Sequence, residues 1–210
     1  MLLSRRLKHF NSLYHGAESV WDIGCDHGLL GLSFTNLASV KEIHLVDPSG
    51  PVISELTLKV KDSYITKTNV YIHHKRGQDL KLKTENSKCI YIAGMGGKEI
   101  QQILVHIENS LDGNDQVIIS PHRKVLELRE WLHQSQYQLR HEGVIFENQQ
   151  FYPYLCLVKD KNLQGVSLFG DKIWSGEVGK AYCHHQIQAF SGHRDRISMD
   201  YLAYLRNIDK

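Results

Sequence analysis

The sequence lacks long apolar runs and is poor in proline. Among 210 residues there are 4 prolines, too few for a proline-rich disordered or fibrous chain. The longest apolar stretches, such as Cys89–Met95, fall far short of the roughly 20 residues that cross a bilayer. The first residues are basic and run into polar sequence, without the apolar core and cleavage site of a signal peptide. These absences argue against a membrane or secreted protein, so we expect a cytoplasmic one.

Paired cysteines are also missing. The 4 cysteines, Cys25, Cys89, Cys156 and Cys183, are widely separated, with no C-x-x-C pair of the kind that binds zinc or forms a redox couple. We therefore expect no metal, and a reducing cytosol fits this cysteine usage. The formal net charge of +2 is too small to indicate a nucleic-acid partner by itself, and nothing in the sequence indicates an oligomeric state.

Runs of β-branched and aromatic residues alternate with helical segments over the first two thirds of the chain. We predict strands at Ser19–Ile23, Glu42–Val46, Val70–His74, Cys89–Ala93 and Val117–Ser120. The predicted helices between them are Leu29–Leu37, Pro51–Asp62, Lys98–Ser110 and Lys124–Ser135. Because crossovers between parallel strands are right-handed, this alternation gives an α/β fold with a Rossmann-like, doubly wound sheet. A basic amphipathic helix, Ser4–Tyr14, precedes the sheet.

The alternation stops after the last of these helices. Tyr137–Ile145 and Gln150–Val158 indicate two consecutive strands joined around Glu147 and Asn148, which form an antiparallel hairpin at the sheet edge. Five parallel strands followed by an antiparallel C-terminal hairpin are typical of class I methyltransferases.

The last fifty residues have a different composition. Beyond Lys159 the sequence becomes polar and contains several glycines, before a last helix from about Lys180 to Leu205. We therefore predict a methyltransferase domain with a basic N-terminal helix over residues 1–159, and a small helical C-terminal appendage over residues 160–210.

The strongest local motif is Val20–Gly28, a strand that runs into a glycine-containing turn before a helix. Gly24 and Gly28 allow the backbone to approach a ligand closely, where a Cβ would clash. Asp47 closes the second strand 19 residues after Gly28, where a carboxylate can accept both ribose hydroxyls of an adenosyl group. Together these residues predict a site for a nucleoside cofactor.

The spacing of the glycines separates two cofactors. A dinucleotide motif needs G-x-G-x-x-G so that the pyrophosphate can lie on the helix N-terminus, but here Asp26 stands at the middle glycine position and would repel a phosphate. S-adenosylmethionine has no phosphate and carries a cationic sulfonium, beside which an acid such as Asp22 is favourable. The motif therefore favours S-adenosylmethionine.

Two further loops follow later strands. Arg76–Leu80 comes after the third strand, where an acid or an amide can meet the adenine amino group of the cofactor. Ile92–Lys98 ends the fourth strand, at the sheet edge where open α/β folds bind ligands. Methyltransferases that act on an exocyclic amine usually have Asp or Asn, two prolines and an aromatic residue there, whereas this chain has glycines. An exocyclic amine is therefore disfavoured as the acceptor.

These motifs together resemble the TrmK family, bacterial tRNA adenine(22)-N1 methyltransferases. The resemblance covers roughly residues 3 to 158. Its segments are Leu3–Leu7, Asp22–His27, Arg76–Leu80 and Ile92–Gly97, with Pro121, Arg129–Leu132 and the hairpin residue Tyr152. The run Ile-Ala-Gly-Met-Gly-Gly and the Asp26-His27 pair are the features most specific to this group.

The resemblance implies attack of adenine N1 on the sulfonium methyl, with tRNA as partner. An adenine that is paired must first be flipped out, because N1 lies on the Watson–Crick edge. Asp26 is the candidate to accept the N6 proton of the product, and His27 to orient Asp26 or contact the base. Asp26 as a helix cap, and His27 as a buried structural residue, are the alternatives.

The candidate site residues fall into three groups. The catalytic candidates are Asp26 and His27. The cofactor-binding candidates are Asp22, Gly24, Cys25, Gly28, Asp47, Pro48, Gly77, Gln78, Asp79, Ala93, Gly94 and Met95. The substrate-binding candidates are Arg5, Arg6, Gly96, Gly97, Pro121 and His122, and Lys8, Lys98, Arg123 and Lys124 are further candidates for phosphate contacts.

Two other functions remain open. The cofactor loops do not fix the acceptor, so another RNA, a protein or a small molecule could be methylated. A non-catalytic RNA-binding relative is the other alternative. It is suggested by two departures from the family pattern, Leu29 in place of a tyrosine and Ser120-Pro121-His122 in place of Gln-Pro-Asn.

Overall fold

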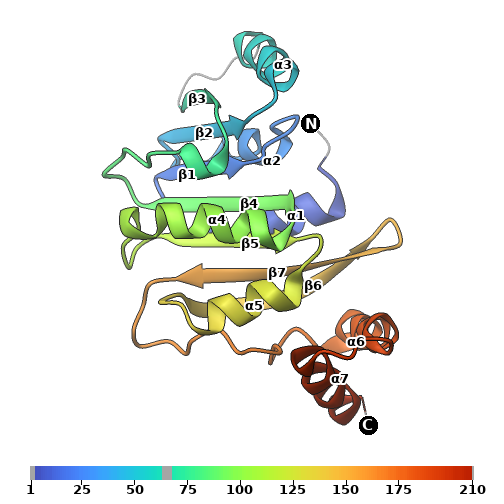
Figure 1. Cartoon of the computed structure of the whole chain (residues 1–210). Coiled ribbons are helices and arrows are strands. Elements are labelled where there is room, and N and C mark those ends of the chain that lie inside the picture. The colour runs from blue at the N-terminus through green and yellow to red at the C-terminus, as the bar shows by residue number, and fades with distance from the viewer. Residues whose placement is uncertain (1–2, 63–67, 210) are drawn as a thin grey trace.

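The computed structural model describes residues 3–62 and 68–209, which form a seven-stranded sheet with helices on both faces (Figure 1). The strands are β1 (Ser19–Ile23), β2 (Glu42–Asp47), β3 (Asn69–His74), β4 (Lys88–Met95), β5 (Gln116–Pro121), β6 (Gln138–Glu147) and β7 (Gln150–Val158). Their order is β3-β2-β1-β4-β5-β7-β6, with β1 to β5 parallel and β7 antiparallel to both neighbours. The predicted sheet of five parallel strands and a terminal hairpin is confirmed.

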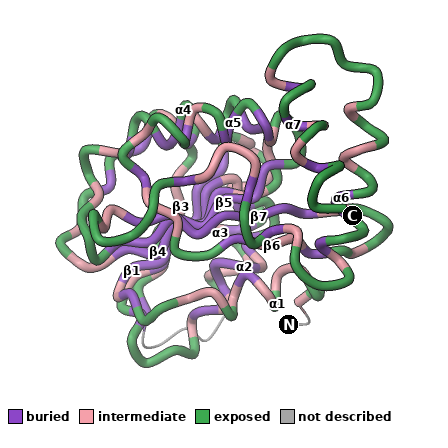
Figure 2. The backbone as a smooth tube through the Cα atoms, turned by 90° about the horizontal axis from the view of Figure 1, so that it is seen from below, coloured by how far each residue is buried: buried purple, intermediate pink, exposed green. Residues whose placement is uncertain are grey.

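The helices form two layers. On one face lie α1 (Arg5–Ser12), α2 (Leu29–Leu32) and α3 (Gly50–Lys61), and on the other lie α4 (Gly97–Ile107) and α5 (Val125–His133). Short 3₁₀ turns, η1 (Gly77–Asp79) and η2 (Glu108–Ser110), connect strands on the α4 side. Figure 2 shows the buried backbone concentrated in the sheet between these layers. Within the described ranges, no helix is both long and apolar enough to cross a membrane.

Side chains alternate between the two faces of each strand, as the pleat requires. In β1, Val20 packs in the cluster under α2 and α3, whereas Trp21 and Ile23 pack in the cluster under α4 and α5. All three are at most 1% exposed. The inner strands are mainly apolar because both of their faces are covered, whereas the edge strand β3 is half exposed and β2 has the buried His44 in its middle.

A two-residue turn makes the hairpin tight. Asn148 and Gln149 connect β6 to β7 with φ of 50° and 60°, both in the left-handed region. Two such residues in succession form the type I′ turn, whose twist matches that of the flanking strands. The hairpin predicted around Glu147 and Asn148 is thereby confirmed. In Figure 1 its tip lies toward the same end of the sheet as α1, the end at which the parallel strands finish.

The last predicted helix is wrong, because two helices replace it. They are α6 (Gly176–Phe190) and α7 (Arg196–Ile208), and they pack against each other. The break lies at Ser191–Asp195, where the Asp195 side chain accepts the Ser198 N–H at 2.9 Å and caps the new helix. A capped start after a glycine-containing turn separates two helices more favourably than one continuous helix.

The helix predicted over Leu29–Leu37 is shorter than expected. It ends after Leu32, because the hydroxyls of Ser33 and Thr35 donate to the carbonyls of Leu30 and Leu32 and stabilise turns in place of a further helical turn.

A buried ion pair fixes the segment that leads to the C-terminal helices. The Arg129 Nη1 lies 2.7 Å from the Glu142 Oε2, with both side chains at most 4% exposed. Arg129 also donates to the Ser167 carbonyl at 2.8 Å, and Glu142 accepts the N–H groups of Asp171 and Lys172. These bonds join residues 167–172 to α5 and β6 of the sheet domain. The predicted division into two parts at residue 159 therefore stays a prediction.

Candidate active site

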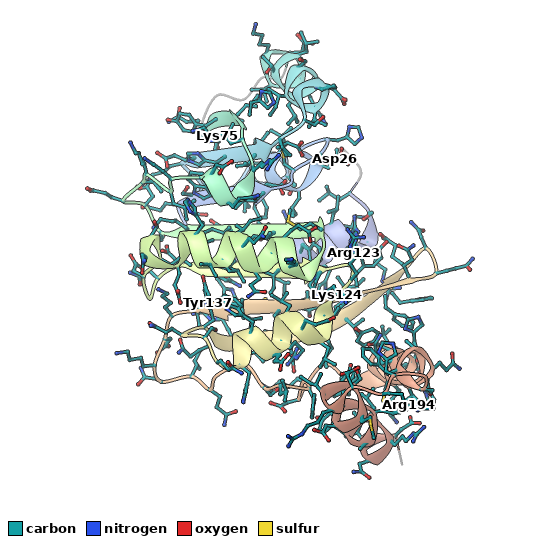
Figure 3. All side chains as sticks on the ribbon, in the orientation of Figure 1. Asp26, Lys75, Arg123, Lys124, Tyr137 and Arg194 are labelled. Carbon is teal, nitrogen blue, oxygen red and sulfur yellow. The ribbon has the colours of Figure 1, made fainter. Side chains whose placement is uncertain are left out.

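The carboxyl ends of β1, β2 and β4 meet at one edge of the sheet, and a cavity of about 570 Å³ lies between that edge and α1. In Figure 3, Asp26 and Arg123 mark this edge. The cavity is lined by Arg6, Leu7, Phe10, Asp22, Gly24, Cys25, Asp26, His27, Leu29, Leu30, Asp47, Pro48, Ala93, Gly94, Met95 and His122. Residues predicted from five separate segments of the chain therefore come together.

The loop after β1 has a backbone that few residues adopt. Gly24, Asp26 and Gly28 all have positive φ, of 74°, 49° and 64°. The loop is held to the next strand by the N–H groups of Gly24 and Cys25, which both donate to the Val46 carbonyl. Glycine at position 24 is favoured by its φ, which strains a residue with a Cβ, whereas the nearest atom to such a Cβ is the flexible end of Met95.

Asp22 is the buried acid of the cavity. Its Oδ2 accepts the N–H of Gly31 at 2.8 Å, in the first turn after β1. Burial raises the pKa of Asp22 to about 7, against the lowering effect of that hydrogen bond, and the nearby carboxylates of Asp47 and Asp26 raise it further. A cationic ligand in the cavity would stabilise the ionised form of Asp22.

Asp47 links the first two loops. Its Oδ2 accepts the Asp26 N–H at 3.2 Å, and its Oδ1 accepts the Ser49 N–H at 2.9 Å. The side chain is 92% buried yet borders the cavity. These bonds fix its orientation, while each carboxylate oxygen keeps a second lone pair for a ligand hydroxyl.

The Cys25 thiol also borders the cavity, but burial raises its pKa, and the negative charges of Asp22 and Asp47 raise it further. Cys25 is therefore protonated at neutral pH and is not a nucleophile.

Asp26 and His27 lie at the mouth of the cavity, with side chains 73% and 56% exposed. The Nε2 of His27 lies 3.7 Å from the Asp26 Oδ1, and its Nδ1 lies 3.1 Å from the Glu55 Oε1 of α3. The alternative roles are not supported: the cap position of α2 is Gly28, and His27 is not buried. An accessible carboxylate beside an imidazole can accept a proton from a bound base.

The end of β4 forms the next wall. Gly94 has φ of 81° at a β-bulge against β5, and a Cβ there would meet no atom within 4 Å. Gly94 is therefore required by its backbone conformation. Gly97 serves packing instead, since a Cβ there would clash with the Lys124 carbonyl oxygen, whereas a Cβ at Gly96 would meet the flexible end of the Glu99 side chain.

One wall of the cavity combines α1, the end of β5 and the hairpin, which are distant in the sequence. The Arg6 guanidinium lies 4.4 Å from the centre of the Tyr152 ring, a cation–π contact, and the Arg6 N–H donates to Glu147 at 3.1 Å. Tyr152 meets the His122 ring edge-on at 5.5 Å. The His122 N–H donates to the Met95 carbonyl at 3.0 Å, and burial lowers the pKa of His122, as does the charge of Arg6.

Several predicted residues lie outside the cavity lining, and their roles stay predictions. They are Arg5, Gly28, Gly77, Gln78, Asp79, Gly96, Gly97 and Pro121. Gly77 has a packing reason, since a Cβ would lie 2.6 Å from Ile103 and 2.8 Å from Ile23. Ser120 faces away from the cavity, because its buried hydroxyl donates to the Pro153 carbonyl.

The sequence prediction missed the apolar floor of the cavity. Leu7 and Phe10 of α1 and Leu30 of α2 contribute to it. The helical spacing of Leu7 and Phe10 was a signal for a buried face of α1, but not for what that face covers. No cluster of three His, Cys, Asp or Glu side chains suited to a metal ion occurs within residues 3–62 and 68–209.

Comparisons with known proteins identify relatives of the whole arrangement. The model of the methyltransferase domain family (Methyltransf_18) matches residues 3–155. The tRNA (adenine(22)-N(1))-methyltransferase of Bacillus subtilis is 29% identical over 79% of this chain and 70% of its own length.

Two solved structures share the fold over the whole chain. An uncharacterized protein of Listeria monocytogenes gives a TM-score of 0.83 at 22% identity, with all of both chains covered. The TrmK of M. capricolum, in complex with S-adenosyl-homocysteine, gives 0.76 at 20% identity and covers 100% of this chain and 95% of that one.

Proposed function

Because this chain belongs to the methyltransferase domain family, we propose that it uses S-adenosylmethionine to methylate N1 of an adenine in tRNA. One observation carries the cofactor part: Asp22, Asp47 and the Gly24–Gly28 loop converge on a cavity at the carboxyl edge of the sheet. The Bacillus subtilis relative, which carries the name of the same reaction, supports the acceptor part.

The residues of the cavity fit the cofactor. Asp47 is fixed by two backbone N–H groups and can accept from the ribose hydroxyls. Asp22 places a carboxyl group where a cation can be neutralised, and the cavity offers apolar surface at Leu29 and Leu30 for a flat ring. A pyrophosphate would instead meet the carboxylates of Asp22 and Asp26, so a dinucleotide does not fit.

The bound cofactor would supply an electrophilic methyl group. Adenine N1 has a lone pair when neutral, so the main task of the protein is to hold that edge of the base toward the methyl. A bond forms between N1 and the methyl carbon as the bond from sulfur breaks, which leaves a positive charge on the adenine. Asp26, exposed at the cavity mouth, accepts the N6 proton of that cation, and His27 positions Asp26.

The remaining assignments follow the cavity walls. Arg6 contacts the adenine nucleotide from α1 and His122 from the end of β5, and Gly94 and Met95 border both ligands. Adenine 22 as the target position rests on the resemblance to the TrmK family and on the printed name of the Bacillus subtilis relative.

The test is transfer of labelled methyl from S-adenosylmethionine to tRNA from cells that lack this protein, followed by mass spectrometry of nucleosides. We expect 1-methyladenosine, with kcat reduced about a hundredfold or more in Asp26→Ala and cofactor affinity unchanged. Glu55→Gln is the matched control, an acid on the other side of His27 that is outside the cavity lining.

The outcomes separate the alternatives. Methylated nucleosides other than 1-methyladenosine would show that the acceptor is a different atom or base, while the assignment as a methyltransferase would stand. Cofactor binding without transfer to any tRNA would favour a non-catalytic RNA-binding relative, as the Leu29 departure suggests.

A further inference from the structure

A second cavity adjoins the first. It has a volume of about 690 Å³ and lies between the start of α5, the tip of the β6–β7 hairpin and the helices α6 and α7. None of the residues predicted to bind the cofactor lines this second cavity. The size is within the range of cavities that hold small molecules or single nucleotides.

His122 connects the two cavities, since it lines both. Tyr152 lines the second cavity and meets the His122 ring edge-on. The guanidinium of Arg6, which lines the first cavity, lies over the Tyr152 ring. A base held in the first cavity would therefore have its neighbour along the strand beside the second.

The second cavity contains an aromatic cluster with an accessible ring. Phe151 lies 5.4 Å from Tyr182 and 5.2 Å from His185, measured between ring centres. Tyr182 is buried, whereas His185 is exposed on α6. Accessible planar rings beside a positively charged rim are the features with which proteins bind single-stranded nucleic acid.

The rim carries two fixed cations and two carboxylates, so its formal charge becomes positive when a histidine of the rim is protonated. Arg123 and Lys124 lie at the start of α5 (Figure 3), and His185 and His193 add charge when protonated. Two carboxylates also line the cavity, and both have partners: Glu127 lies 2.7 Å from Lys124, and Asp195 accepts the Ser198 N–H and lies 3.9 Å from His193. Arg123 is the cation best placed for a phosphate.

We propose that the second cavity is a subsite for the unpaired nucleotide next to the target adenine. Its base stacks against the Phe151 and His185 rings, and its phosphate contacts Arg123. The link to the target adenine rests on the proposed function, but the binding of single-stranded RNA does not. The subsite would hold the strand in register while the target base occupies the first cavity.

The test uses two neighbouring histidines of α6. His185→Ala removes an exposed ring of the subsite, and His184→Ala is the matched control, because His184 is also exposed but pairs with Asp209 and does not line the cavity. The probe is a fluorescein-labelled, unstructured RNA of about ten nucleotides. We expect His185→Ala to weaken its binding about tenfold and His184→Ala to leave it unchanged.

A second variant guards against an indirect effect. Phe151→Leu keeps an apolar side chain in the hairpin but removes the stacking ring, and we expect a similar loss of affinity for the RNA. Affinity for S-adenosylmethionine should be unchanged in all three variants, which shows that the first cavity is intact.

The outcomes distinguish this subsite from the proposed function. Binding that depends on His185, without methyl transfer to tRNA by the unaltered protein, would support the subsite and sink the proposed function. Methyl transfer with RNA affinity and tRNA KM unchanged in both His185→Ala and Phe151→Leu would overturn the subsite alone. Failure of the unaltered protein to bind the RNA would also overturn it.

Discussion

The two cavities that meet at His122 are built in opposite ways. The first is formed largely by loops at strand ends, and it contains three acids, of which Asp22 and Asp47 accept backbone N–H groups and Asp26 is exposed at the mouth. The second is formed by side chains of the hairpin and of three helices, and its polar groups are mainly basic and aromatic.

The difference shows how one small fold separates two tasks. Backbone conformation, with positive φ at Gly24, Asp26 and Gly94, gives a rigid site suited to one invariant small molecule. Side chains on packed helices give a surface whose charge and shape can suit a larger, variable polymer. The second cavity therefore depends on packing between distant segments, and the first depends chiefly on its own loops.

The largest expected effect comes from Arg129→Met, which would break the second cavity without touching the first. Burial raises the pKa of Glu142, but the charge of Arg129 and the N–H groups of Asp171 and Lys172 lower it below its ordinary value. Removal of Arg129 leaves a buried unpaired carboxylate, so the free energy of unfolding in urea should fall by about 3–5 kcal/mol. In the double variant with Glu142→Gln the loss should be clearly smaller, and an equal loss would refute this account.

Asp47→Ala should break the first cavity and spare the second. The variant loses the acceptor proposed for the ribose hydroxyls and the bonds to the Asp26 and Ser49 N–H groups. We expect binding of S-adenosylmethionine, measured by calorimetry, to weaken about a hundredfold, since hydrogen bonds to a charged group contribute about 1.5–3 kcal/mol each. Asp47→Asn keeps one acceptor oxygen, so its affinity for S-adenosylmethionine should lie between those of the unaltered protein and of Asp47→Ala. RNA affinity that falls in parallel would show that the two cavities are not separate.

Acidity should sharpen the comparison, because Asp22 of the first cavity titrates near neutrality. The pKa of Asp22 is about 7 in the folded chain against an ordinary value of 3.8. Between these values the folded chain holds a proton that the unfolded chain has lost, so stability without cofactor should decrease as pH rises from about 4 to about 7.

Cofactor affinity should follow the opposite course over the upper part of this range. Ionised Asp22 favours a cation, so S-adenosylmethionine should bind about tenfold more tightly at pH 8 than at pH 6, as expected for one group with a pKa near 7. In Asp22→Asn both dependences should disappear. A pH dependence that persists in this variant would assign it to another group.

The smallest expected effect lies at the wall between the cavities. Arg6→Gln removes the cation–π contact with Tyr152 and a candidate phosphate contact, so the KM for tRNA should rise about threefold, for a contact of about 0.5–1 kcal/mol. Arg5→Gln is the matched control, since Arg5 is exposed and outside the lining. Equal effects of the two variants would indicate general attraction by the basic helix and no specific role for Arg6.

The sequence predicted the first cavity well, because its signals are local. The five parallel strands follow from the alternation of strands and helices, and Asp22, Gly24 and Asp47 are recognisable from their places at strand ends. The loop after β3 shows the limit of this reasoning. Gly77 is a packing residue between Ile23 and Ile103, which no local pattern reveals.

The second cavity could not be predicted in this way. Its aromatic cluster forms only where α6 packs against the hairpin, which brings Tyr182 and His185 to Phe151. The sequence pattern of either element does not indicate which element it packs against. The break between α6 and α7 did have a local signal. Asp195 is a favoured N-cap residue, and its side chain accepts the N–H of Ser198 three residues later. The polar residues on both sides of Asp195 give no clear sequence signal for the end of the preceding helix.

The sheet order has a consequence for the time at which the site is completed during synthesis. Since β7 lies between β5 and β6, β6 cannot join the sheet until β7 has left the ribosome. Arg6, among the first residues made, must then wait for Glu147 and Tyr152 before its wall of the cavity exists. A nascent chain can thus form the cofactor loops early, yet it becomes able to hold a substrate only when synthesis is nearly finished.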